Sequence, residues 1–74
     1  MSDERAALDA ALIAAHEADD RPLLVQLYTR AADQAGDLDT ECFFLTQAYV
    51  FALQIGAPEA GTLHARLLAH GREE

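Results

Sequence analysis

The chain of 74 residues has little of what crosslinks a protein or anchors it in a membrane. It holds a single cysteine, Cys42, so an intrachain disulfide is excluded. No stretch approaches the roughly 18 consecutive apolar residues of a transmembrane helix. The acidic start, Met1 to Glu4, lacks the basic and apolar regions of a secretory signal. These absences predict a cytoplasmic protein with no membrane partner.

Positive charge is also scarce, because five arginines and no lysine stand against thirteen carboxylates, for a net charge of −8. Nucleic acids and anionic lipid surfaces are bound by clustered basic side chains. Here the arginines are scattered along the chain, so we expect no nucleic-acid partner. The alanine-rich, lysine-free composition is typical of a GC-rich bacterial source.

The apolar residues can form only a small core. A chain of 74 residues is expected to be one domain spanning residues 1–74. Its apolar content is 16 alanines, which bury little area, with 11 leucines, two valines, two isoleucines and five aromatics. Below roughly 70 to 80 residues one core rarely supplies more than about 3 to 5 kcal/mol, and stability often depends on a partner.

Helix-forming residues and well-placed breakers predict four helices and no strand. Asp20 can cap the second helix with Pro22 in its first turn, Asp37 can cap the third, and Gly56 can end it. The loops of two to four residues favour antiparallel neighbours. The predicted fold is therefore all-α, with two stacked αα-hairpins or a short bundle, and helices at about 3–18, 21–35, 38–55 and 58–70.

The third predicted helix is apolar around most of its circumference, which indicates a central helix with several neighbours. Its main stripe comprises Leu38, Cys42, Leu45, Tyr49 and Ala52. A surplus of apolar residues lies outside that stripe: Phe43, Phe44, Val50, Phe51 and Ile55. Either all of these side chains fill the core, or they form an exposed aromatic patch that docks another helix or a second copy of the chain.

A faint internal repeat appears when the chain is shifted by 36 residues. It superimposes Pro22 on Pro58, Tyr28 on His64 and Arg30 on Arg66. Two similar hairpins are the simplest interpretation. We therefore expect Tyr28 and His64 to line a groove between the hairpins, with the two arginines at its rim.

The segment from Leu27 to Pro58 resembles a tetratricopeptide-repeat hairpin. The likeness rests on the turn at residues 36–39, on Ala48 and Ala52 in the second helix of this hairpin, and on the proline that follows. Glu41 stands where the family usually has a small residue. The resemblance implies a peptide-binding scaffold and no enzymatic activity. The run 42–49 is also similar to small uncharacterised bacterial helical proteins, which implies no particular activity.

Candidate catalytic and metal-binding groups do not combine into a recognisable site. An acyl carrier protein would need a serine at the start of a helix, but the only serine is Ser2. His64 and His70 are six residues apart and lie on different helix faces, while His16 has only capping carboxylates nearby. Cys42 lies on the apolar stripe and is expected to be a buried hydrophobe. We expect neither an enzyme nor a cofactor.

The sequence thus favours a small acidic interaction module that binds a protein or peptide, or forms a homodimer, through aromatic surface on its second to fourth helices. The predicted contact residues are Tyr28, Arg30, Phe44, Phe51, His64 and Arg66. One alternative is a small-ligand or metal-binding protein that uses His16, His64 or Cys42. Another is a structural subunit of a larger complex.

Overall fold

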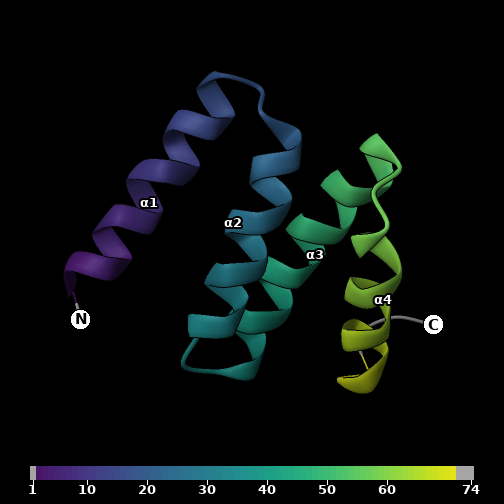
Figure 1. Cartoon of the computed structure of the whole chain (residues 1–74). Coiled ribbons are helices and arrows are strands. Elements are labelled where there is room, and N and C mark those ends of the chain that lie inside the picture. The colour runs from purple at the N-terminus through teal and green to yellow at the C-terminus, as the bar shows by residue number, and fades with distance from the viewer. Residues whose placement is uncertain (1, 72–74) are drawn as a thin grey trace.

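The computed structural model describes residues 2–71 of the chain, with side chains from Glu4 onwards. It contains four α-helices: α1 (Ser2–Glu17), α2 (Arg21–Gln34), α3 (Leu38–Ile55) and α4 (Glu59–Ala69) (Figure 1). These bounds differ from the predicted ones by no more than one residue at either end, and no strand occurs in residues 2–71. The predicted all-α fold is confirmed.

Local capping explains where α2 and α3 begin. The Asp20 carboxylate accepts a hydrogen bond from the Leu23 amide at 3.3 Å, and Pro22 occupies the first turn, where no amide donor is needed. The Asp37 carboxylate accepts from the amide of Thr40 at 3.0 Å and from its hydroxyl at 2.8 Å. Both aspartates predicted as caps therefore act as caps.

Three helices end through a left-handed residue, and for α4 this is Gly71, with φ of 72°. Gly56 closes α3 with φ of 65°, a conformation that glycine adopts at little cost. At the end of α1 the same role falls to Asp19, with φ of 53°. The Asp20 amide then donates to the Ala15 carbonyl at 2.9 Å, which satisfies one of the last carbonyls of α1.

The helices form a row in which α1 packs on α2, α2 on α3, and α3 on α4. The Cα atoms occupy 34 × 28 × 13 Å, so the molecule is flat. In Figure 1, α1 and α2 meet at the loop that joins them and diverge toward the N-terminus. This arrangement gives α2 and α3 a neighbour on either side and leaves α1 and α4 at the edges.

Burial follows from that arrangement. Toward α1, α2 buries Leu24, Leu27 and Ala31. It also buries Val25 and Ala32, a second stripe, in the core shared with α3 and α4. On α3, the prediction that Leu38 lies in the core is wrong, since this first residue of the helix is 46% exposed at the edge of the fold.

Candidate interaction surface

The inner face of α3, which we define by Phe44 and Phe51, belongs to the fold. Both rings are half-buried and pack against the core on either side of α2. Tyr28 of α2 stacks on Phe51 with ring centroids 6.1 Å apart and lies 6.0 Å from Phe44. Of the two alternatives for the apolar surplus of α3, the core holds for these two phenylalanines, because Tyr28 and side chains of α1 cover them.

His16 connects α1 to this inner face. Its Nε2 lies 2.8 Å from the Tyr28 hydroxyl, and its ring meets those of Tyr28 and Phe51 edge-on at 5.8 and 5.9 Å. Partial burial raises the pKa of Tyr28 above its ordinary value of 10.0. A candidate metal ligand in the sequence is thus a structural partner of Tyr28.

The opposite side of α3 is uncovered. Phe43, Val50 and Leu53 are 58%, 42% and 55% exposed, respectively. Together with Thr46, they occur at spacings of three, four and three residues, which is the pattern of a seam between paired helices. We call these four residues the outer stripe. Of the two alternatives for the apolar surplus of α3, the exposed patch holds for Phe43 and Val50; Ile55 is exposed on another face of the helix, and Leu53 was not predicted.

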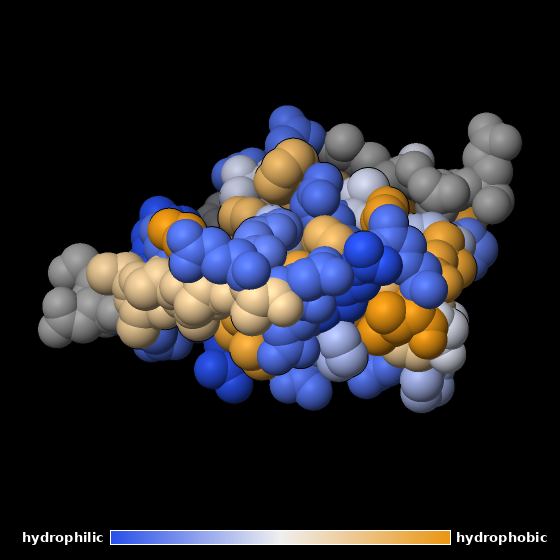
Figure 2. Space-filling view, turned by 90° about the horizontal axis from the view of Figure 1, so that it is seen from above, coloured by the Kyte–Doolittle hydropathy of each residue, from blue (hydrophilic) through white to orange (hydrophobic). Residues whose placement is uncertain are grey.

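The helix segment that carries the outer stripe is uncharged, and Asp39 is the charged residue at its start. A shallow groove of about 350 Å³ lies at the N-terminal end of the stripe and is lined by Asp39, Cys42, Phe43 and Thr46. From residue 42 to residue 58 the chain carries no aspartate, glutamate, lysine, arginine or histidine, although its net charge is −8. Among residues 4–71, five of the eight exposed large hydrophobic residues belong to α3. Seen from above, apolar side chains reach the surface in separate groups among hydrophilic ones (Figure 2).

Aromatic rings border the outer stripe where α3 meets α4. Tyr49 stacks on His64 with centroids 5.4 Å apart and an interplanar angle of 17°. Leu68, 44% exposed, follows His64 by four residues and therefore lies on the same side of α4. His64 thus joins α4 to α3 through Tyr49, and Leu68 is exposed on the same side of α4.

A cluster of charged groups attaches α4 to the two central helices. Arg66 lies 2.9 Å from the carboxylate of Asp33 on α2 and 3.4 Å from that of Glu41 on α3. The Nε2 atom of His70 is 3.0 Å from the same Glu41 carboxylate. Glu41 therefore holds two side chains of α4, a role that spacing along a single helix could not reveal.

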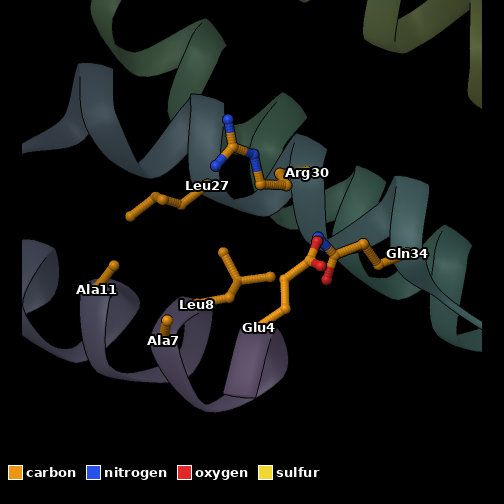
Figure 3. Close-up of a pocket in the computed structure, with 7 residues that line it drawn as sticks. All are labelled: Glu4, Ala7, Leu8, Ala11, Leu27, Arg30 and Gln34. Carbon is orange, nitrogen blue, oxygen red and sulfur yellow. The ribbon is translucent and has the colours of Figure 1, made fainter. Parts of the chain in front are cut away.

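Arg30 lies elsewhere, at a pocket of about 150 Å³ between α1 and α2. Leu8 and Leu27 point toward each other across this pocket, and the Gln34 amide donates to the Glu4 carboxylate at 2.7 Å (Figure 3). The ion pairs found within residues 4–71 do not include Arg30.

The expected groove that gathers Tyr28, His64, Arg30 and Arg66 is therefore wrong. Tyr28 faces α1 and α3, His64 faces Tyr49, and the two arginines lie at unrelated sites. The sequence repeat aligns α2 with α4, yet the two helices have different surroundings. Helix α2 has a neighbour on each side, whereas α4 packs on α3 at the edge of the row.

No cluster of three or more histidine, cysteine, aspartate or glutamate side chains in the described part of the chain is arranged to hold a metal ion. Cys42 is 4% exposed and lies in the core. Among the described helices, none combines the length and apolarity needed to cross a membrane. Comparisons with known protein families, with curated proteins and with solved structures found no match. A function for this chain therefore has to be inferred from its own surface.

Proposed function

We propose that this chain is a protein–protein interaction module that docks an apolar helix along the outer stripe of α3. The observation that carries the proposal is the exposure of Phe43, Val50 and Leu53 at seam spacing on one helix face. Fully burying a side chain of this size stabilises by about 1.5 to 3 kcal/mol, so partial burial of three of them supports a specific contact. Docking of a helix into an apolar groove is a common mode of peptide recognition.

The tetratricopeptide-like interpretation of the α2–α3 hairpin fits this role as part of the proposal. Such a hairpin acts as a rigid support when its inner face is well packed. Here Tyr28 stacks on Phe51, and Arg66 joins α4 to both helices of the hairpin. We further place the module in the cytoplasm, where reduced thiols such as the free, buried Cys42 persist. No catalytic activity is part of the proposal.

Site-specific photo-crosslinking tests the proposed function. The photoreactive amino acid p-benzoylphenylalanine is introduced in place of Val50 in one variant and of Gln26, an exposed residue of α2, in a control. Irradiation in cells that express the chain is expected to give crosslinked protein from position 50 and none from position 26. Adding Phe43→Asp to the position 50 variant should abolish the product. Equal crosslinking from both positions would contradict docking on the outer stripe.

A further inference from the structure

The charge distribution restricts what can occupy the outer stripe. Charged partners are recognised through complementary charges at the contact. The stripe lies within the uncharged segment 42–58, and Asp39 at its start is the one carboxylate lining the groove. Glu41 pairs with Arg66 and His70, and no carboxylate of α1 lines the groove. A matching occupant therefore presents an apolar, uncharged helix face of its own.

The spacing within the outer stripe is symmetric about residue 48. Phe43 and Leu53 lie five residues before and after it, and Thr46 and Val50 lie two residues before and after it. Two copies of α3 placed antiparallel would therefore bring Phe43 of each copy against Leu53 of the other, and Thr46 against Val50. Such a two-fold contact uses the same surface on both molecules. The groove that begins at Asp39 would receive the Val50 and Leu53 side chains of the second copy.

We propose that the outer stripe docks on the same stripe of a second copy of this chain, as an antiparallel α3 pair. The two-fold axis would pass between Thr46 and Val50 on the exposed face of the helix. This inference rests on the proposed function, because it names the occupant of that docking face. The large side chains at the ends of one stripe meet large side chains of the other, and the small Thr46 meets the medium-sized Val50. The net charge of −8 does not oppose the pairing locally. The acidic helix α1 packs on α2, away from the stripe, and salt screens charges beyond about 8 to 10 Å.

Light scattering across micromolar to millimolar concentrations tests the pairing. The unaltered chain is expected to form a dimer, and Val50→Glu is expected to raise its dissociation constant by at least about 100-fold, because the new charge would be buried without a partner. Gln26→Glu adds the same charge on an exposed position of α2 and should leave the dimer intact. Circular dichroism checks that both variants keep their helices. A chain that remains monomeric at every concentration, or a dimer that both variants weaken equally, would overturn the proposal.

Disulfide exchange tests the direction of the pair. In a Cys42→Ala background, a Thr46→Cys variant and a Val50→Cys variant are mixed under mild oxidation. The antiparallel pair is expected to give mostly the mixed disulfide between the two variants. Disulfides formed mainly between identical positions would indicate a parallel pair and overturn the proposed geometry.

The two proposals fail in different ways. A monomeric chain that is still crosslinked from position 50 to another polypeptide would refute the pairing and leave the proposed function standing. A monomeric chain without any crosslink from position 50 would refute both.

Discussion

Phe43 and Phe44 are adjacent in the sequence and their rings meet edge-on at 5.5 Å, yet they lie on different faces of α3. Phe44 lies on the inner face of α3 beneath Tyr28, whereas Phe43 is 58% exposed on the outer stripe. The inner face is covered because α1 reaches across α2, and His16 reinforces that cover through Tyr28. The outer face has no such neighbour in the described part of the chain. Two side chains of equal hydrophobicity thus lie in the core or on the surface, depending on which face of α3 the other helices cover.

Truncating the two faces should have very different effects on stability. Phe51→Ala removes a ring that stacks on Tyr28 and should lower the free energy of unfolding by about 3 kcal/mol. Phe43→Ala removes an exposed ring and should change it by less than about 0.5 kcal/mol when measured on the monomer. Urea unfolding followed by circular dichroism measures both values. Equal losses would show that the two faces are not distinct.

The charged cluster of Arg66, Asp33 and Glu41, which attaches α4, should contribute less to the free energy of unfolding than the inner face of α3. Arg66→Ala removes the contacts of a partly exposed guanidinium with Asp33 and Glu41 and should cost about 1 kcal/mol, less at high salt. Arg30→Ala is the matched control, since Arg30 takes part in none of the ion pairs within residues 4–71. Urea unfolding at low and high ionic strength separates the two variants. An Arg30→Ala variant as unstable as Arg66→Ala would refute the role of the cluster.

The hydrogen bond between His16 and Tyr28 can be removed while the Tyr28 ring stays on the inner face of α3. Tyr28→Phe keeps the ring on Phe51 and deletes the hydroxyl that meets His16, so it should cost about 0.5 to 1 kcal/mol. Hydrogen exchange should show the loss as faster opening of α1, with α3 and α4 unchanged. Uniform acceleration across all four helices would contradict a local role for this bond.

The smallest expected effect is on the pH dependence of stability. It comes from Asp37, the cap of α3, and α3 carries both the inner and the outer face. Hydrogen bonds from the Thr40 amide and hydroxyl lower the pKa of Asp37 below its ordinary value of 3.8. Because the folded pKa is depressed, this stabilisation is present above pH 3.8 and is lost as the pH falls through the lowered pKa. Asp37→Asn should reduce the pH dependence of stability in that acidic range. An unchanged acid-unfolding profile would contradict the assignment.

The sequence predicts best what depends on neighbouring residues. Caps such as Asp20 and Asp37 act within one helical turn, so the helix bounds follow from local spacing. The contact between His16 and Tyr28 depends on the register between two helices, and no periodicity within either helix contains it. The same limit applies to the second buried stripe of α2, since burial of Val25 and Ala32 requires knowing that α2 has two neighbours.

The assignment of the inner and outer faces of α3 can be tested most directly by nuclear magnetic resonance of the unaltered chain at increasing concentration. Binding at the outer stripe predicts that the side-chain signals of Phe43, Val50 and Leu53 shift with concentration, whereas those of Phe51, which Tyr28 covers, stay constant. Shifts confined to the inner phenylalanines, or signals that do not move at any concentration, would contradict the proposed self-docking surface.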